Sequence, residues 1–177
     1  MNDNDDLKKE YERIKTLIND GTASAKDWAW IYYFIFGWHI LPGFKGQKHS
    51  YLSWKKDGFI NKRYDWDFLE KEFSKPEVIN ILLVTGKLSN VTVVDFDSKK
   101  TVSEKASFLI EELPRTLTSI TGSGGKHFFY RFMKEFPDLI GIEKCIDIRN
   151  DGLIVLPPSI HENGNFYEWE DINDYLN

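Results

Sequence analysis

Two carboxylates, Asp95 and Asp97, stand two residues apart at the end of an apolar run that begins at Val91. Alternate residues of a β-strand face the same way, so both carboxylates would project from one face while Phe96 turns into the core. Carboxylates this close repel each other unless a cation lies between them, and oxygen ligands suit magnesium or manganese. The alternative is that the pair only caps the strand end and the turn that follows.

A glycine-rich turn with the sequence Thr-Gly-Ser-Gly-Gly-Lys-His occupies residues 121–127, between two predicted strands. Adjacent glycines, here Gly124 and Gly125, let a backbone approach a phosphate closely and aim amide hydrogens at it. Ser123, Lys126 and His127 could add side-chain donors. The spacing is not that of a Walker loop, and a strand rather than a helix follows. The alternative is a plain hairpin turn with a basic residue at its shoulder.

A third carboxylate, Asp147, alternates with Arg149 on a later predicted strand, so these two side chains share a face. If Asp147 faced the first pair, it would complete a two-cation site, and Arg149 beside it could meet a phosphate. The alternative is an intrastrand pair of opposite charges on a solvated face.

Two consecutive prolines follow Leu156 and predict a rigid turn that could place Ser159 and His161 accurately. Tyr167 and Trp169 then alternate on one face of a last short strand. The alternative for the turn is a structural corner, and for the two aromatic residues we favour core packing.

The spacing of apolar residues and of turn residues predicts the helices and short strands that position these residues. Predicted helices cover residues 6–19, a segment capped by Ser24 and stopped by Gly37, residues 65–73, and a segment capped by Thr101 with Glu104 that ends before Pro114. Predicted strands cover residues 38–41, 81–84, 91–96, 116–121, 127–132, 144–149, 153–156 and 166–169. The second and third of these strands form a predicted hairpin, and Pro42 and Gly43 open a predicted basic loop. Helices flanking a mostly antiparallel sheet indicate an α+β class.

Composition predicts one domain over residues 1–177, with residues 1–22 as a helical N-terminal appendage. The single Cys145 allows neither an internal disulfide nor a cysteine-based zinc site, and the acidic N-terminus is unlike a signal peptide. We therefore expect a cytoplasmic protein with no membrane partner. The net charge of −5 would count against nucleic acid, but carboxylates that bind cations are neutralised, and basic residues cluster between Lys45 and Arg63.

The four chemical segments, in this order, resemble the catalytic domain of the primase-polymerase (Prim-Pol) group within the archaeo-eukaryotic primase superfamily, known from replication proteins of plasmids, phages and other mobile elements. The resemblance covers residues from about 28 to about 170. It includes the glycine-to-proline strand at residues 37–42, Thr85-Gly86, the acidic motif at residues 94–97, the small-x-histidine motif at residues 123–127, and the motif at residues 146–149. The two prolines with Ser159 and His161, and then Gly164 and residues 167–169, continue the match.

This resemblance implies an RRM-like, mostly antiparallel sheet that carries the active site of a nucleotidyltransferase. Asp95, Asp97 and Asp147 would hold two divalent ions, Mg²⁺ or Mn²⁺, and His127 would contact the phosphates or sugar of the incoming nucleotide. Further nucleotide contacts would come from the glycine turn and from polar residues after it: Ser123, Gly124, Gly125, Lys126, Arg149, Ser159 and His161. The implied partners are a single-stranded DNA or RNA template, a primer and nucleoside triphosphates, with an accessory C-terminal domain and replication- or CRISPR-linked proteins as further candidates.

The basic segment could hold the template strand, with Tyr51 or Trp54 stacking on bases and Lys48, Lys55 and Lys56 contacting the backbone. Two other functions stay open. One is a nucleotide- or nucleic-acid-binding module of the same fold that has no activity. The other is a haloacid-dehalogenase-like phosphatase, in which an apolar strand also ends in two aspartates.

Overall fold

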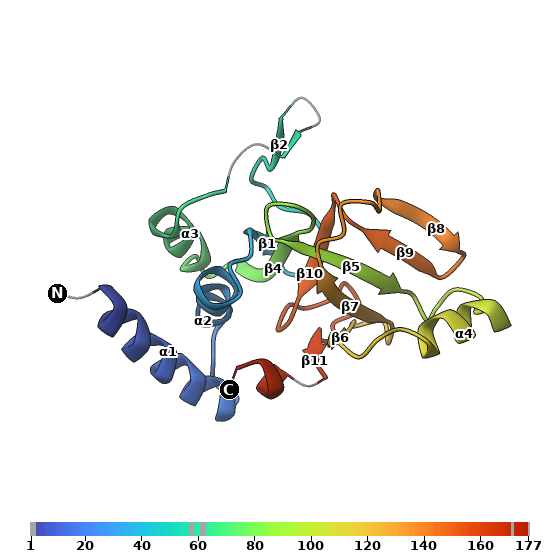
Figure 1. Ribbon diagram of the computed structural model, residues 1–177. Helices are drawn as coiled ribbons and strands as arrows, with labels where there is room; N and C mark the ends of the chain where they lie inside the picture. Colours follow the sequence, from blue (N-terminus) through green and yellow to red (C-terminus); the bar gives the residue numbers. More distant parts are fainter. Residues whose placement is uncertain (1–2, 57–58, 61–62, 171, 177) are drawn as a thin grey trace.

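The structure is a computed structural model, and it describes residues 3–56, 59–60, 63–170 and 172–176. Two antiparallel sheets lie side by side, with three helices gathered against the smaller sheet and a fourth on the larger one (Figure 1). The smaller sheet has the order β1-β4-β10 and the larger sheet the order β11-β6-β7-β5-β9-β8, while β2 and β3 form a separate pair. The class is α+β, as predicted.

The strands of the larger sheet are β5 (Val91–Phe96), β6 (Leu117–Ile120), β7 (Lys126–Arg131), β8 (Leu139–Glu143), β9 (Ile146–Arg149) and β11 (Glu168–Trp169). Those of the smaller sheet are β1 (Ile40–Phe44), β4 (Val78–Val84) and β10 (Leu153–Leu156), and the separate pair is β2 (Lys55–Lys56) with β3 (Phe59–Ile60). The helices are α1 (Asp3–Asn19), α2 (Ala25–Trp30), α3 (Trp66–Phe73) and α4 (Glu104–Glu111), with a π-helical turn η1 (Ile31–Ile35) and a 3-10 turn η2 (Ile172–Tyr175). None of the described helices is long and apolar enough to cross a membrane.

Side-chain caps explain where three of the helices begin. Ser24 caps α2 as predicted, and its hydroxyl and the Asp27 carboxylate form a reciprocal capping box. Asp65 caps α3 by accepting from the Phe68 amide. The predicted cap at Thr101 is wrong, because Ser103 accepts from the Ala106 amide and starts α4 two residues later.

The predicted hairpin of residues 81–84 with residues 91–96 does not form, because β4 and β5 belong to different sheets. β4 pairs with β1 on one side and with β10 on the other, so it offers no free edge to β5. The strand predicted at residues 38–41 is also displaced: β1 runs on through Pro42, which a sheet edge tolerates because its amide is not needed for pairing. β8 was not predicted at all.

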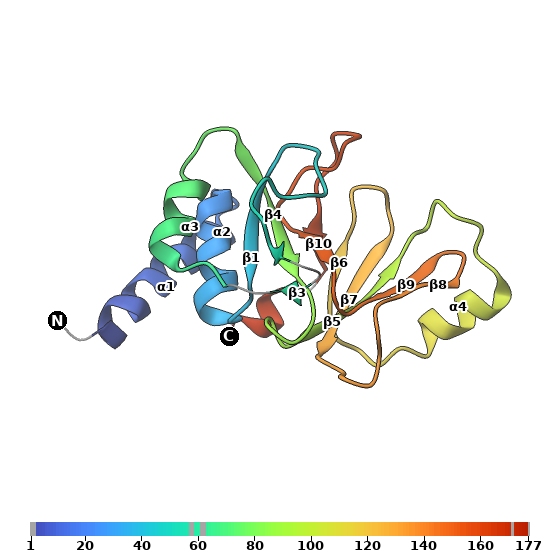
Figure 2. The same ribbon diagram turned by 90° about the horizontal axis from the view of Figure 1, so that it is seen from above.

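The two faces of the larger sheet pack against different apolar clusters. Val93, Leu117 and Phe129 join the main core, which the sheet shares with α2, β1 and β4. Val94 and Ile146 form a second cluster with Ala106 of α4 on the opposite face. Figure 2 shows α4 on the far side of this sheet from the smaller one. Because alternate residues of β5 pack in the two clusters, Asp95 and Phe96 at the end of the strand lie on opposite faces of the sheet.

The N-terminal helix α1 is joined to this core. Ile14 is fully buried, the Tyr11 hydroxyl donates to the carbonyl of Leu176, and Arg13 forms an ion pair with Asp27 at 2.7 Å. These contacts bring α1 and the C-terminal turn η2 together, as Figure 1 also shows.

One buried histidine, His39, should make the stability of the fold depend on pH. Its side chain is 0% exposed, and neither ring nitrogen has a hydrogen-bond partner among the described residues. Burial, helped by the positive charge of Arg63, lowers the pKa of His39 to about 4. In the unfolded chain, His39 takes up a proton near pH 6.5. The free energy of unfolding therefore has its full value above that pH and decreases as the pH falls toward 4.

A His39→Leu protein should therefore lose less stability on acidification than the wild type. Between pH 7 and pH 4.5, the difference in unfolding free energy should be about 2–3 kcal/mol in favour of the variant. Urea unfolding at both pH values measures it, and His49→Leu, at an exposed position, serves as the control. An acid loss as steep in His39→Leu as in the wild type would contradict this assignment.

Candidate active site

Four neighbouring strands of the larger sheet place one polar residue each in a single row. Ser119 of β6 lies opposite His127 of β7, His127 opposite Asp95 of β5, and Asp95 opposite Asp147 of β9. Directly opposed residues of antiparallel strands project from the same face. Asp95 is therefore flanked by His127 and by a second carboxylate, on the face that Val93 shares with the main core.

Asp97 lies just beyond the end of β5 and continues its direction. Its amide donates to the carbonyl of Cys145 at 2.9 Å, so pairing with the β9 side extends past Phe96. One carboxylate oxygen accepts from the Lys99 amide at 3.1 Å, and the other lies 3.7 Å from Lys100 Nζ. Phe96 packs in the cluster under α4, as its predicted turn toward the core required.

Asp95 and Asp147 share one face of the sheet, and Asp97 follows the end of β5 and lines the same pocket as Asp95. Carboxylates are the donors that a hard divalent cation prefers. Each of the outer two has a protein partner in this structure, since Asp147 Oδ1 accepts from the Gly141 amide at 2.5 Å and Asp97 faces Lys100. Within the described ranges, no three His, Cys, Asp or Glu side chains are gathered closely enough to hold a metal ion. The residue types thus fit Mg²⁺ or Mn²⁺, and binding would have to draw the carboxylates together.

His127 is buried beside Asp95, with 5% of its surface exposed and with Nε2 3.5 Å from Asp95 Oδ1. The imidazole lies near the Val155 backbone, but its buried Nδ1 has no hydrogen-bond partner among the residues that the structure describes. Burial lowers the pKa of His127 more than the Asp95 carboxylate raises it, and the charges of Lys48 and Arg149 lower it further. His127 is consequently neutral at pH 7, with one nitrogen free to donate or accept.

The glycine turn at residues 121–125 joins β6 to β7 and is held by its own hydrogen bonds. Thr121 Oγ1 accepts from the Gly125 amide at 2.9 Å and lies 3.0 Å from Ser123 Oγ. Gly124 has a φ of +87°, which favours glycine, and a Cβ on Gly125 would lie 2.2 Å from the Phe96 carbonyl oxygen. The turn is thereby pressed against the backbone between Asp95 and Asp97.

The loop of residues 161–165 packs against this turn. The side-chain amides of Asn163 and Asn165 both donate to the carbonyl of Gly122, at 2.8 Å and 3.0 Å. A Cβ on Gly122 would lie 2.3 Å from the Cβ of His161, so the two loops are in close contact. Neither asparagine is among the predicted site residues.

Asp95, Asp97 and His127 open into a pocket between the two sheets, which residues of β10 also line. One wall is apolar and comes from β10 and from Tyr167, whose ring stacks on His127 with 6.0 Å between centroids. The other wall is polar and combines carboxylates, hydroxyls and two lysines. Its members are Asp95, Asp97, Thr121, Ser123, His127, Lys48 and Lys100. Such a pocket offers hydroxyl and ammonium donors to an anion next to a cluster of carboxylates.

The family model described as bifunctional DNA primase/polymerase, N-terminal (Prim-Pol), matches residues 31–175 of the chain. The chain belongs to the Prim-Pol family. Among curated proteins, no match is found. Membership indicates an activity of the nucleotidyltransferase type, with nucleic acid and nucleotide as the classes of ligand. The match and the antiparallel neighbours of β5 leave the phosphatase alternative without support.

Not every predicted site residue of this Prim-Pol domain reaches the pocket. Lys126 lies on the opposite face from His127 and forms an ion pair with Glu170 at 2.7 Å. Ser159 is fully buried, and its hydroxyl accepts from the Ile81 amide at 2.8 Å, which is a structural link between the β10 end and β4. Neither residue can contact a nucleotide in the pocket in this conformation.

Arg149 and His161 lie close to the site without lining the pocket. The Arg149 guanidinium packs on Gly152, where a Cβ would come within 2.5 Å of it, and its Nε is 3.9 Å from Asp138 Oδ1. His161 is buried against Tyr167, with 5.9 Å between ring centroids.

The predicted template residues divide into two groups. Lys48 lines the pocket itself, on the polar wall. Lys55 lies over the Trp54 ring, 4.7 Å from its centroid, and pairs with Asp151 at 3.0 Å, in the loop between β9 and β10. Lys56 is part of β2, and Lys62 of the predicted basic segment lies outside the described residues.

Proposed function

We propose that this Prim-Pol domain is a template-dependent DNA primase/polymerase that transfers a nucleotide to a 3′-hydroxyl or to an initiating nucleotide and releases pyrophosphate. The observation that carries the proposal is the row of His127, Asp95 and Asp147 across three strands. His127 and Asp95 line a pocket with basic and hydroxyl groups, and Asp147 lies next to Asp95 without lining it. A binding module without activity needs no such opposition of two carboxylates, which costs stability unless a cation is bound.

Asp95, Asp97 and Asp147 would hold two divalent ions, which when bound lower the pKa of the attacking hydroxyl and neutralise the triphosphate. Asp95 lies between His127 and Asp147 in the row and would be one of the ligands. Neutral His127 can donate a hydrogen bond to a phosphate or sugar oxygen without competing for the cations. Catalysis then consists of positioning and charge stabilisation, as in phosphoryl transfer generally.

The triphosphate would lie along the glycine turn. Ser123 and Thr121 present hydroxyls to the pocket, and Lys48 and Lys100 bring positive charge to its polar wall. Lys100 lies 3.7 Å from Asp97 in this structure, so it neutralises that carboxylate until a cation replaces it and then is free to meet phosphate. The apolar wall of β10 and Tyr167 would face the sugar and base.

Metal-dependent incorporation of labelled nucleotide on a single-stranded template tests the proposal. Wild-type protein should extend a primer with Mg²⁺ or Mn²⁺ in the order that the template dictates, while an Asp95→Ala, Asp97→Ala double variant should give no product. Product without an added primer would show initiation as well as extension. Nucleotide binding with no incorporation under any metal would instead support the binding module.

Trp54 should contribute to affinity for the template strand. Its ring lies next to Lys55 at the edge of the site, where aromatic stacking and positive charge together suit single-stranded nucleic acid. Replacing Trp54 by alanine should weaken single-stranded DNA binding by about 1–3 kcal/mol, roughly 5- to 150-fold. Fluorescence anisotropy measures it, with Trp66→Ala on α3 as the aromatic control. Unchanged affinity in Trp54→Ala would remove Trp54 from the template path.

A further inference from the structure

The edge strand β8 reaches the predicted metal ligands through an irregularity in its pairing. Its register against β9 shifts between Leu139 and Glu143, so β8 carries a bulge. Gly141 lies in this bulge with a φ of +73°, and its N–H donates to Asp147 Oδ1 at 2.5 Å instead of to a backbone carbonyl of β9. The bulge therefore aims a backbone donor at a side chain of the candidate active site.

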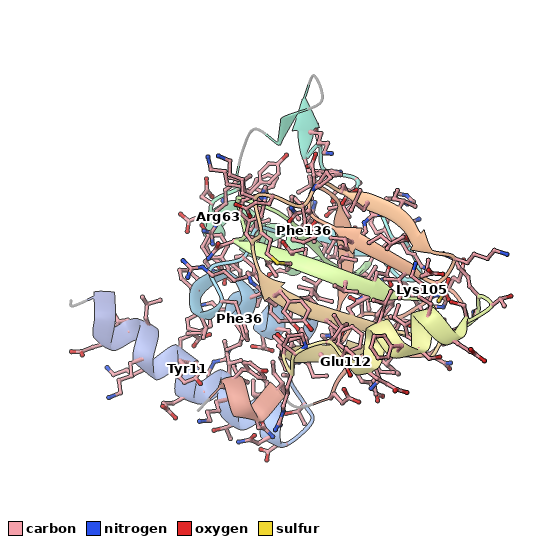
Figure 3. All side chains as sticks on the ribbon, turned by 45° about the vertical axis from the view of Figure 1, so that its right-hand side comes forward. Tyr11, Phe36, Arg63, Lys105, Glu112 and Phe136 are labelled. Carbon is pink, nitrogen blue, oxygen red and sulfur yellow. The ribbon has the colours of Figure 1, made fainter. Side chains whose placement is uncertain are left out.

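Both ends of β8 are fixed, so the bulge has a defined position. Before the strand, Asp138 Oδ1 accepts from the amides of Asn150 at 2.7 Å and Asp151 at 3.2 Å. At its other end, Glu143 pairs with Lys105 at 2.7 Å and accepts from the Ser103 hydroxyl at 3.2 Å, at the start of α4. Figure 3 shows Lys105 on α4, beside the end of the β8-β9 pair. An edge strand held in this way can fix a donor without a neighbour on its outer side.

We propose that the Gly141 amide is the positioning group for Asp147, which it holds through Oδ1 so that Oδ2 is the oxygen left for a divalent cation shared with Asp95. The inference rests on the proposed function, because it takes Asp147 as a ligand of that cation. Asp147 stands directly opposite Asp95, and without a fixed donor the two like charges would turn the carboxylates away from each other. Hydrogen bonds that orient a ligating carboxylate in this way typically change metal affinity by about 10- to 100-fold.

The test removes the N–H of residue 141 and keeps every side chain. Incorporation of glycolic acid in place of Gly141, by nonsense suppression in the full chain, turns that amide into an ester. Gly141→Ala is the matched variant that keeps the donor, since its Cβ would meet no atom within 4 Å and only the left-handed backbone is strained. Glycolic acid in place of Gly21, whose N–H bonds to the Ile18 carbonyl far from the site, controls for the loss of a scaffold hydrogen bond.

Mn²⁺ affinity, measured by electron paramagnetic resonance, and thermal unfolding in chelator are the two readouts. The ester at position 141 should bind Mn²⁺ about 10- to 100-fold more weakly than the wild type, while Gly141→Ala and the ester at position 21 stay within about twofold. Equal Mn²⁺ affinity in the ester at position 141 and the wild type would overturn the inference and leave the proposed function standing. So would an equal loss in both esters. Wild-type affinity no higher than that of Asp95→Asn would instead overturn the metal centre itself, and the inference with it.

Discussion

Asp95→Asn protein is expected to fold as the wild type does and yet to incorporate nucleotide at least about 10³-fold more slowly. Charge neutralisation by a bound metal ion is worth several kcal/mol in the transition state, and each ~1.4 kcal/mol is a factor of ten in rate. Asp95 is the residue that both His127 and Asp147 flank, and it would hold a cation together with Asp97 and Asp147. Single-turnover extension of a primed template at saturating nucleotide measures the loss.

Stability should respond in the opposite direction, which separates a catalytic role from a structural one. Asp95 and Asp147 face each other directly, so replacing one carboxylate by an amide removes a like-charge repulsion. Thermal unfolding in chelator should therefore give Asp95→Asn a midpoint no lower than that of the wild type. Added Mn²⁺ should raise the midpoint of the wild type only, because a ligand stabilises the state that binds it.

Glu111→Gln supplies the control for the loss of a carboxylate, since Glu111 is exposed on α4, on the other face of the sheet. It should change neither the rate nor the response to Mn²⁺. Substantial extension by Asp95→Asn, with the same metal dependence as the wild type, would rule out Asp95 as a metal ligand.

Much of this site could be predicted from the sequence, because strand periodicity is a local property. Alternation alone predicted Asp95 and Asp97 on one side and Phe96 on the other; in the structure both carboxylates line one pocket, and Phe96 packs in the cluster under α4. The same rule separates Lys126 from His127, since adjacent residues of a strand face opposite ways. The prediction that both would donate to one ligand was therefore at odds with the strand alternation. Lys126 pairs with Glu170, more than forty residues away in the sequence, and no local pattern predicts this contact.

Neighbours across the sheet could not be predicted in this way. That His127 and Asp147 flank Asp95 depends on β7 and β9 both pairing with β5, which only long-range packing decides. The predicted hairpin of residues 81–84 with 91–96 failed for the same reason, because short separation in sequence favours a hairpin while two other strands already occupy β4. β8 could not be predicted, because its five residues include Gly141 and are mostly exposed, so they show no alternation of apolar and polar residues.

Gly125→Ala is expected to damage the site through the backbone rather than through any lost donor. A Cβ at this position would lie 2.2 Å from the carbonyl oxygen of Phe96 and 3.2 Å from Thr121 Oγ1. The first of these atoms belongs to the peptide that joins Phe96 to Asp97, so the turn and the end of β5 must move apart. A displacement of about 1 Å at a catalytic group can cost roughly 10²-fold in rate, and overpacking typically costs about 1–3 kcal/mol in stability.

The neighbouring glycine separates this close approach from backbone strain. Gly124→Ala would be strained by its φ of +87°, but its Cβ would meet only Ser98 Oγ at 3.5 Å, an ordinary contact. Both variants should therefore lose stability, by about 1–3 kcal/mol each, while only Gly125→Ala should lose about 10²-fold in extension rate. Urea unfolding and single-turnover extension under conditions where both variants are folded compare them. Equal loss of rate in the two would mean that the turn acts through its own conformation; a loss confined to Gly125→Ala would mean that its contact with β5 sets the positions of Asp95 and Asp97.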